Sequence, residues 1–495
     1  ALFVKELEKR QNVKITFQGP PSSNTYNDAV NTMLASGDIT DLIVWDWRNY
    51  AGGLDGAVKD GIVFNFTAQK ECMDQLPNFL KRVGANELVR LGYTQNDGSL
   101  MPVFCTIQEG FNGTPYSGSA AYQGLAIRQD WLDRLGLKVP RTVDELYTVL
   151  SAFKRQDANG NGDPNDEIPY SSNNPDPRSF NQLIAAWGLR NNMFYPDPQN
   201  PGKLTYWTLY KNGQAFTAML TALSQWYREG LLDTDFFTQN NNARISKVTS
   251  DKVGVSYTDP TNGADWRDAI KKLRPEIADK VKFTGLQPLI GPEGKPYASQ
   301  DNLISMANTE EATVITRRAE REGKIPAILK LIDYMYSDEG SVLSSYGVEG
   351  VSYTRDAQGR FAWTPEMSLD PQFPLKSKLL QYAVPYIGRF PRFAFYEAWR
   401  ISNTYDTDAA AIHAEYLKAD FSILMPVVTL SQDQSEEYNR LMADINTAVN
   451  EFYVSAITGR RPVSDAPAFF AQLQSMGLGR AQEIYQAAYT QFMSR

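Results

Sequence analysis

The stretch GLAIRQDWLDRLGLKVPRTVDELYTVLSAFKRQDANGNGDPNDEIPYS, residues 124–171, decides the fold class. Its first part, residues 124–137, predicts a strand that runs directly into an amphipathic helix. Thr142 and Glu145 follow with the spacing of a capping box, in which the hydroxyl and the carboxylate bind reciprocal backbone N–H groups. A second helix is therefore expected to run to about Arg155, and a loop rich in Asp, Asn and Gly comes directly after it.

Strands and helices also alternate at the start of the chain. Apolar spacing predicts helices at 2–10 and 26–37 and strands at 13–21 and 41–47. Such alternation is typical of a parallel sheet covered by helices, so the predicted fold class is α/β. Further along, the sequence predicts a strand at 252–257 and helices at 216–230, 324–347 with a Gly break, 435–459, and 466–492 with a break near Gly477.

The loop DANGNGDPNDE, residues 157–167, has the spacing of a calcium loop. Counted from Asp157, oxygen-bearing side chains stand at positions one, three, five and seven, and a glycine stands at position six. Position twelve is Ile168 where an EF-hand has a bidentate Glu, so we expect a loop that Asp166 or Glu167 closes differently. The alternatives are a flexible linker and a solvated Asn-Gly turn.

Composition narrows the classes of function. The 495 residues suggest two or three domains, and the net charge of −8 without a basic stripe disfavours nucleic acid as a partner. His413 is the single histidine, which disfavours zinc sites and nucleophile–His pairs. Aromatic residues make up 12% of the chain, which fits a surface for flat ligands or, alternatively, a large two-domain core.

The chain has two cysteines and no membrane-spanning run. Cys72 and Cys105 fit either a disulfide or two free thiols, because the sequence does not give their distance. No apolar run reaches the roughly 18 residues that a spanning helix needs. The chain begins inside a helical pattern, and we expect it to be processed or trimmed.

Several stretches together resemble one family, the extracellular solute-binding proteins of carbohydrate ABC importers. The resemblance is to the long lipoprotein branch, which includes alginate-binding and other oligosaccharide-binding members. The stretches that carry it are 35–47, 126–171, 228–236, 346–360 and 457–489. They lie in a consistent order over nearly the whole chain, and the segment from Arg128 to Pro169 is the most specific.

The resemblance implies a two-lobed, type II periplasmic-binding-protein-like fold with a ligand cleft between the lobes. Each lobe would be a mainly parallel sheet flanked by helices. The N-terminal lobe would comprise 1–125 plus about 300–370, and the C-terminal lobe 126–299 plus about 371–495. The family's structural calcium site maps onto the C-terminal lobe, where its ligands would be Asp157, Asn159, Asn161, Asp163, Asp166 and Glu167.

The resemblance also implies the function. Such a receptor, which is not an enzyme, captures an oligosaccharide by lobe closure about hinge strands near 124–127 and 285–300 and delivers it to membrane permease subunits. We expect a monomer whose only membrane contact is a lipid anchor upstream of residue 1. Its location would be the surface of a Gram-positive-type bacterium, or the periplasm.

Sugar chemistry selects the candidate ligand residues. A pyranose presents an apolar face to aromatic rings and hydroxyls to carboxylates, amides and Arg. Gln108 and Tyr116 are weaker candidates from a Gly-rich region. For each aromatic residue, packing in the core is the alternative. The predicted ligand-binding residues are Trp45, Asp46, Trp47, Glu109, Arg128, Tyr257, Asp259, Trp266, Tyr396, Glu397 and Trp399; the resemblance supplies Trp266 and Trp399.

Three interpretations remain open beside this one. Arg128 and Asp130 fit a structural ion pair as well as a sugar contact, and Trp131 fits the core. A glycoside hydrolase would need two carboxylates about 5–9 Å apart, and no recognisable catalytic frame of that kind stands in the sequence. A receptor for a non-carbohydrate solute, such as a peptide or another polyol, is the third.

Overall fold

The structure is a computed structural model in which most of the chain is described. No helix among the described residues is long and apolar enough to cross a membrane. The described residues are 2–19, 25–95, 97–109, 122–173, 177–191, 193–298, 311–368, 379, 381–383, 390–395, 407–426, 428 and 430–495.

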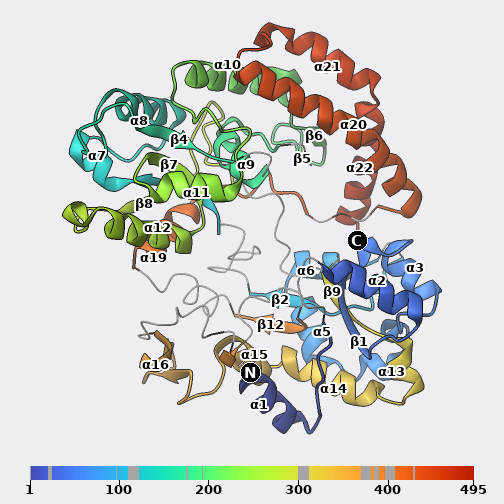
Figure 1. Cartoon of the computed structure of the whole chain (residues 1–495). Coiled ribbons are helices and arrows are strands. Elements are labelled where there is room, and N and C mark those ends of the chain that lie inside the picture. The colour runs from blue at the N-terminus through green and yellow to red at the C-terminus, as the bar shows by residue number, and fades with distance from the viewer. Residues whose placement is uncertain are drawn as a thin grey trace. The chain divides into compact units, whose positions relative to one another are not determined.

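The chain folds into two compact units, each built from stretches that are far apart in the sequence (Figure 1). Unit 1 comprises 1–118, 304–405 and 491–495, and unit 2 comprises 119–303 and 406–490. The sequence-based boundary near 370 differs from this division. The reason is strand β12 (Arg392–Ala394), which pairs with β2 (Thr106–Gln108) of unit 1 and so keeps residues up to 405 in that unit.

Unit 1 combines short strand pairs with helices around an aromatic core. β1 (Leu42–Asp46) is antiparallel to β9 (Glu311–Ile315), whereas β2 and β12 are parallel. The rings of Phe66 and Phe104 stack at 4.5 Å in this core. The remaining elements are α1 (Leu2–Gln11), α2 (Tyr26–Ser36), α3 (Gly53–Lys59), α4 (Lys70–Met73), α5 (Pro77–Gly84), α6 (Glu87–Tyr93), α13 (Arg317–Arg321), α14 (Ile325–Tyr336), α15 (Asp338–Tyr346), α16 (Pro365–Ser368), and the hairpin of β10 (Tyr353–Arg355) and β11 (Phe361–Trp363).

Unit 2 is built on a four-stranded sheet of order β4-β7-β3-β8. Its strands are β3 (Gly124–Arg128), β4 (Ile168–Ser171), β7 (Val253–Thr258) and β8 (Phe283–Leu286). A separate hairpin joins β5 (Phe194–Pro196) and β6 (Leu204–Tyr206). The helices are α7 (Gln129–Leu135), α8 (Val143–Arg155), α9 (Pro177–Ile184), α10 (Gln214–Arg228), α11 (Asn241–Thr249), α12 (Pro260–Leu273), α19 (Thr407–Tyr416), α20 (Gln432–Ile457), α21 (Ala466–Ser475) and α22 (Leu478–Met493), the last of which ends in unit 1.

The sheets are mixed rather than mainly parallel, so that part of the prediction is wrong for the described strands. In unit 2, β4 and β7 are parallel, but β3 is antiparallel to both β7 and β8. Helices connect β4 to β7 and β7 to β8, and such crossovers return the chain in the same direction. β3 is instead the first described strand of unit 2 in chain order, and it lies between β7 and β8 in the opposite direction.

Local signals fix most helix ends where the sequence predicts them. The capping box at Thr142 and Glu145 forms both of its hydrogen bonds at the start of α8. Gly37, with φ 74°, ends α2 in the left-handed conformation. The break in the predicted helix 324–347 lies at Ser337, whose hydroxyl caps α15, and Gly340 lies inside that helix.

The predicted strand at 13–21 is wrong for its described part. Residues 13–19 form no strand, and no ladder partner pairs with them in the described part of the chain. The backbone N–H of Ile15 instead donates to the Glu8 carboxylate at 2.8 Å, which turns the chain back onto α1.

Both cysteines are free and buried, so no disulfide joins them. Burial raises the pKa of the Cys105 thiol to about 12, although the Tyr93 hydroxyl opposes this shift. Burial, and then the charge of Glu71, also raise the pKa of Cys72.

We therefore expect iodoacetamide to leave both thiols unmodified in the native protein at pH 8 and to alkylate both in concentrated urea. The thiolate is the reactive form, and burial both suppresses it and blocks the reagent. Mass spectrometry measures the added groups. A Ser36→Cys variant, whose new thiol is exposed, is the control that must react without urea. Alkylation of Cys105 in the native protein would contradict the expectation.

Candidate functional site

In unit 1, the two tryptophans predicted to contact ligand lie in the core. Ile43 and Trp45 are the inward-facing positions of β1, and the Trp45 ring is 0% exposed. Its Nε1 donates to Asn27 Oδ1, and Trp47 Nε1 donates to the Ala312 carbonyl. The rings meet edge to face at 5.5 Å. The prediction is therefore wrong for Trp45 and Trp47, because strand alternation and a buried partner strand turn them inward.

Asp46 is partly exposed, but its carboxylate binds a neighbouring residue of the same segment. Its carboxylate accepts from Arg48 Nε at 2.9 Å and from Arg48 Nη2 at 2.7 Å, and it caps the short helix at Trp47–Asn49. The edge that this residue occupies belongs to an antiparallel pair, β1 with β9, and is not the carboxyl edge of a parallel sheet. Ligands of α/β sheets usually bind at the carboxyl edge of parallel strands, so the pairing of β1 gives Asp46 no such position.

The parallel pair in unit 1 lies elsewhere, at β2 and β12. Gln108 ends β2, and the next residue, Glu109, is exposed and donates its backbone N–H to the Ala394 carbonyl at 2.9 Å. Carboxyl ends of parallel strands are the usual place for a ligand, so Glu109 keeps its role as a candidate. Four predicted residues, Tyr116, Tyr396, Glu397 and Trp399, lie outside the described residues.

In unit 2, a polar cluster gathers where β7 ends and β3 begins. Thr258 pairs with Gly124, and the next residue, Asp259, caps α12 by accepting from the Asn262 backbone N–H at 2.8 Å. The Tyr122 hydroxyl lies 3.4 Å from Thr261 Oγ1. Burial, and then the Asp259 carboxylate, raise the pKa of Tyr122. Asp259 and Tyr122 are both half-buried, and their carboxylate and phenol interact with each other.

Two further tyrosine rings surround Asp259. Tyr257, predicted from the sequence, is 6% exposed, and Tyr416 of α19 is buried against the start of β3. Burial and then the charge of Asp259 raise the pKa of Tyr416. Sequence reasoning missed Tyr122 and Tyr416. The signal for Tyr122 was its place just before β3, but nothing local marks Tyr416, which comes from a distant helix.

The close packing of Tyr416 on Gly124 makes a test of this cluster. A Cβ atom on residue 124 would overlap the Tyr416 ring. We expect Gly124→Ala to lower the free energy of unfolding by about 1–3 kcal/mol through overpacking, measured by urea denaturation. Gly92→Ala, where a Cβ atom meets open space in α6, is the control and is expected to be neutral or stabilising. An unchanged Gly124→Ala variant would contradict the packing.

Trp266, predicted to bind sugar, lies in the core of unit 2. It is 3% exposed and meets Phe283 edge to face at 5.9 Å. The Arg244 guanidinium lies 5.3 Å from its ring centre and 5.5 Å from that of Tyr257. The position of Trp266 on α12 turns it toward the sheet, so the structure contradicts the prediction for this residue.

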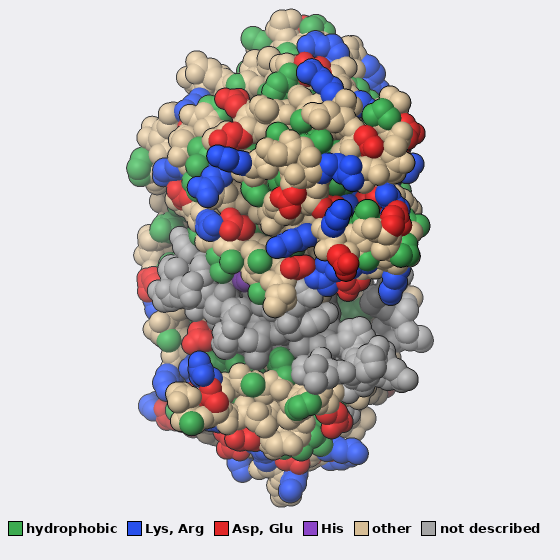
Figure 2. Space-filling model, turned by 90° about the vertical axis from the view of Figure 1, so that its left-hand side faces the viewer, with side chains coloured by type: hydrophobic (Ala, Val, Ile, Leu, Met, Phe, Trp, Pro, Cys, Tyr) green, Lys and Arg blue, Asp and Glu red, His purple; other side chains and the backbone are tan. Residues whose placement is uncertain are grey.

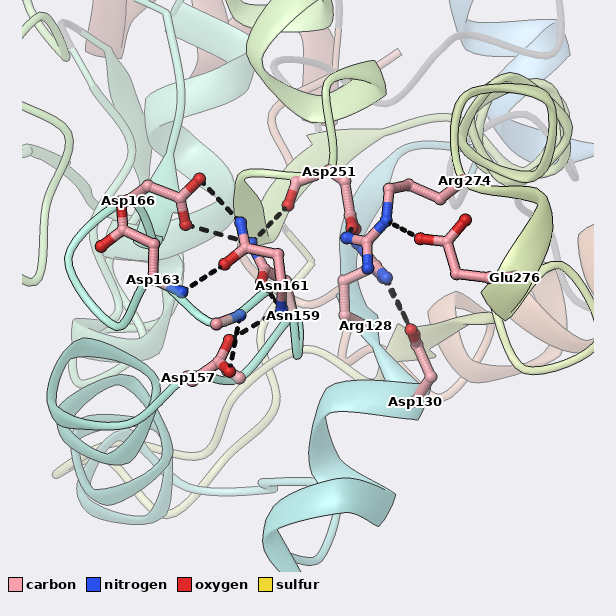
Figure 3. Close-up of polar contacts among 12 residues, drawn as sticks. Arg128, Asp130, Asp157, Asn159, Asn161, Asp163, Asp166, Asp251, Arg274 and Glu276 are labelled. Carbon is pink, nitrogen blue, oxygen red and sulfur yellow. Dashed lines mark hydrogen bonds and ion pairs between the residues drawn. The ribbon is translucent and has the colours of Figure 1, made fainter.

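Arg128 is the centre of a buried ion cluster rather than a sugar contact. It is 0% exposed and binds Asp130 through Nε at 2.9 Å and through Nη2 at 2.5 Å. Its Nη1 binds Asp251, which also accepts from Arg274 Nη1 at 2.7 Å (Figure 3). The structural interpretation of Arg128 and Asp130 is thus the correct one. Trp131 is buried beneath Arg128, as expected for a core residue.

The acidic loop follows α8, and its Asp157, Asn159, Asn161 and Asp166 side chains face one another (Figure 3). The exposed Asp163 carboxylate instead accepts from Asn165. Asp157 accepts the backbone N–H groups of Asn161 and Gly162, each at 3.0 Å. The amide groups of Asn159 and Asn161 donate to the two oxygens of Asp166 at 3.1 and 3.0 Å. Gly162, with φ 91°, makes the bend that the calcium-loop pattern requires.

One atom of this loop lacks a partner. Glu167 is 2% exposed; its Oε1 accepts from the Ala158 N–H at 2.8 Å, but its Oε2 is buried without a hydrogen bond in the described part of the chain. Burial, and to a lesser degree Asp166, raise the pKa of Glu167. A buried carboxylate oxygen among amide and carboxylate oxygens fits a hard cation. The described residues bring no three His, Cys, Asp or Glu side chains together as a metal cluster, so amide oxygens would have to contribute.

Charged side chains of both signs are mixed on the described surface that Figure 2 draws. On the face drawn in Figure 2, acidic and basic side chains of the described residues are interspersed, without a continuous basic band. Elsewhere in the described part of the chain, many charged side chains pair with each other, as Arg318 does with Glu322 at 2.8 Å and Arg480 with Glu437 at 2.9 Å.

Comparison with known sequences identifies relatives of one kind. No family model matches the chain. The fructooligosaccharide ABC transporter substrate-binding protein FusA of Streptococcus pneumoniae is 28% identical over 70% of this chain. The polygalacturonan/rhamnogalacturonan-binding protein YtcQ of Bacillus subtilis is 24% identical over 72%. The matches cover 60% and 64% of the length of these two relatives.

Solved structures share the fold over the whole chain. FusA in complex with kestose has a TM-score of 0.72 and 22% identity, covering 100% of this chain and 96% of that one. An EF-hand mutant of FusA in complex with fructo-nystose gives the same values. The alginate-binding protein AlgQ2 without calcium ion has a TM-score of 0.68 and 22% identity, covering 99% and 94%. These neighbours confirm the predicted two-lobed α/β fold.

Proposed function

Because the chain is a homologue of the substrate-binding proteins of ABC transporters, we propose that it binds an oligosaccharide and delivers it to a membrane permease. The resemblance inferred from the sequence is confirmed by these relatives. Their names supply the ligand classes to test, which are fructooligosaccharides and galacturonan-type polymers. An extracellular or periplasmic location, a lipid anchor and a monomeric state belong to the same proposal.

The observation that carries the proposal is the cluster at Asp259. A carboxylate and a phenol side by side can accept and donate hydrogen bonds to vicinal sugar hydroxyls, and charged acceptors make the stronger bonds. The half-buried Tyr122 ring can offer apolar surface to the C–H face of a pyranose or furanose, whereas the rings of Tyr257 and Tyr416 are buried. In unit 1, Glu109 at the carboxyl edge of β2 offers a second carboxylate of this kind. Tyr396, Glu397, Trp399 and the lobe-closure mechanism stay predictions.

We also propose that the acidic loop holds a structural calcium ion. The ligands would be Asp157, Asn159, Asn161, Asp163, Asp166 and Glu167, and the buried Glu167 Oε2 supports this assignment. A calcium ion bound there supplies positive charge that these oxygens can share. The loop lies between α8 and β4, so its residues would pin the capped helix to the strand that follows. The candidate sugar residues are on other elements.

Asp259→Asn tests the sugar site without removing the helix cap, because Asn caps helices as well as Asp does. We expect affinity for the preferred sugar to fall at least about tenfold, since a charged acceptor becomes a neutral amide. Isothermal titration calorimetry with kestose and with galacturonan oligomers measures this. Asp356→Asn, which changes an exposed turn carboxylate in unit 1, is the control and should leave binding unchanged.

The same titrations separate a receptor from an enzyme. Stoichiometric binding without new products over hours supports the receptor, whereas release of shorter sugars would support a glycoside hydrolase. Binding of short peptides in place of every sugar tested would contradict the carbohydrate assignment. Equal sugar affinities for Asp259→Asn and the unsubstituted protein would remove Asp259 from the site.

A further inference from the structure

Asp251 occupies an unusual position between the acidic loop and the central strands of unit 2. It is 2% exposed and adopts φ 62°, a left-handed conformation that is rare for residues other than glycine and tolerated best by Asn and Asp. It comes two residues before β7 begins at Val253. Such a conformation persists only where the surroundings hold it, so the contacts of Asp251 indicate what it does.

One set of contacts reaches the acidic loop. The Asn159 side chain donates through Nδ2 to the Asp251 carbonyl at 3.2 Å, in a buried environment (Figure 3). Next to it, the Ile168 N–H donates to the Lys252 carbonyl at 2.8 Å, where β4 leaves the loop and pairs with β7. Asn159 is therefore both a predicted cation ligand, through its oxygen, and a hydrogen-bond donor to Asp251, through its nitrogen.

The other set of contacts reaches β3. The Asp251 carboxylate binds Arg128, the last residue of β3, and Arg274, which follows α12. Arg128 is fully buried, so these partners determine where that end of β3 lies. Asp251 thus fastens the end of β3 to the start of β7, and the same two strands pair along their length.

The far ends of these two strands carry the proposed sugar residues. β3 begins at Gly124, next to Tyr122, and β7 ends at Thr258, next to Asp259. With about 3.3 Å per residue, the strand pair joins the ion cluster to the Asp259 cluster over about 17–20 Å. Paired strands in a buried sheet are rigid, so a restraint on the backbone at one end of the pair also restrains the residues at its other end.

We infer that Asp251 is a positioning residue through which a cation in the acidic loop orders the β3–β7 strand pair and the sugar residues at its far end. This inference rests on the proposed function of both sites. Asn159, restrained by a cation at its Oδ1, keeps its Nδ2 on the Asp251 carbonyl and holds the left-handed turn. Without that restraint, the turn, the Arg128 pairing and the end of β3 loosen together.

Two matched substitutions separate this link from the cation site itself. Asn159→Asp keeps an oxygen ligand, which calcium loops accept at this position, but removes the amide that donates to Asp251. Asn161→Asp makes the same chemical change in the same loop, yet the Asn161 amide donates to Asp166 and not to Asp251. Asp251→Asn tests the contact between Asp251 and β3. Asparagine tolerates the left-handed conformation and keeps the backbone carbonyl, but it lacks the charge that binds Arg128.

The experiment uses the full chain and hydrogen–deuterium exchange with mass spectrometry, with saturating calcium or with a chelator. Calcium binding by each variant is measured separately by calorimetry. In the unsubstituted protein and in Asn161→Asp, calcium is expected to slow exchange of the 124–128 and 253–258 amides about tenfold. In Asn159→Asp and Asp251→Asn, bound calcium is expected to change these rates less than about twofold.

Each other outcome overturns the inference. Equal protection of β3 by calcium in Asn159→Asp and Asn161→Asp removes Asp251 from the link. Calcium binding without any effect on β3 in the unsubstituted protein overturns the inference and leaves the metal assignment intact. No calcium binding at all overturns both, while kestose titration of the same sample reports separately on the sugar receptor. If Asp251→Asn fails to fold, the comparison of Asn159→Asp with Asn161→Asp still tests the inference.

Discussion

Arg128→Met is expected to lower the free energy of unfolding by about 3–5 kcal/mol, the largest effect of any single substitution considered for this protein. The guanidinium is fully buried, and its removal leaves Asp251 with Arg274 alone and Asp130 with no partner from β3. A buried carboxylate that loses its counter-charge must be desolvated without compensation, which is why a broken pair costs far more than an exposed one. Urea denaturation followed by circular dichroism measures the change.

Arg318→Met is the matched control. Arg318 also contacts several carboxylates, but its side chain is 38% exposed, so we expect a loss below about 1 kcal/mol. The double variant Arg128→Met with Asp251→Asn should lose less than the sum of the two single variants, because it removes a buried charge together with its partner. A loss below about 1 kcal/mol for Arg128→Met would show that the cluster contributes no more than surface pairs.

Calcium is expected to raise the melting temperature, and replacement of Asp157 and Asn161 by Ala to abolish that increase. For an affinity on the order of 0.1–1 mM, about 10 mM calcium stabilises the folded state by about 1.4–2.7 kcal/mol. The double variant loses two ligands and also the side-chain acceptors of the Gly162 and Asp163 N–H groups, so it should melt lower even in chelator. Differential scanning calorimetry with calcium and with EGTA measures both effects.

The same variant separates direct sugar contacts from the effect of the cation. Its direct sugar contacts are unchanged, so kestose or galacturonan binding should persist well below its melting temperature, with a lower affinity because no cation orders the sugar residues. Identical melting of the unsubstituted protein in calcium and in EGTA would refute the metal assignment. Calcium-dependent melting that survives in the double variant would place the ion elsewhere.

Local chemistry explains which predictions from the sequence succeed. Residues 124–171 fold into the predicted strand, helix, capped helix and loop, because a capping box and glycine turns are specified by neighbours within a few residues. The cation-binding spacing at Asp157–Glu167 is local in the same way. The fold class could also be predicted, since alternation of strands and helices belongs to the chain order itself.

Predictions about what a side chain faces required partners that are distant in the sequence. Trp47 donates to Ala312, 265 residues away, and Arg128 binds Asp251, 123 residues away. A tryptophan beside an aspartate has the same local pattern whether it faces a ligand or a core, so Trp45 and Trp266 were assigned to the wrong environment. Tyr257 and Asp259 could be predicted because the end of a strand and the cap of the next helix are adjacent in the sequence. Tyr416 could not, because it comes from a separate segment of unit 2.

The division of unit 1 into three stretches constrains how the chain can be made. About 265 residues separate β1 from its partner strand β9 in the sequence. The separation between β2 and β12 is longer still, so β1 and β2 are both synthesised long before their partners. Until β12 has been synthesised, the nascent chain carries unpaired strand edges that invite misassociation. Pairing of the strands of this unit therefore waits for residues 392–394, and expression of residues 1–118 alone should yield aggregates rather than an independent domain.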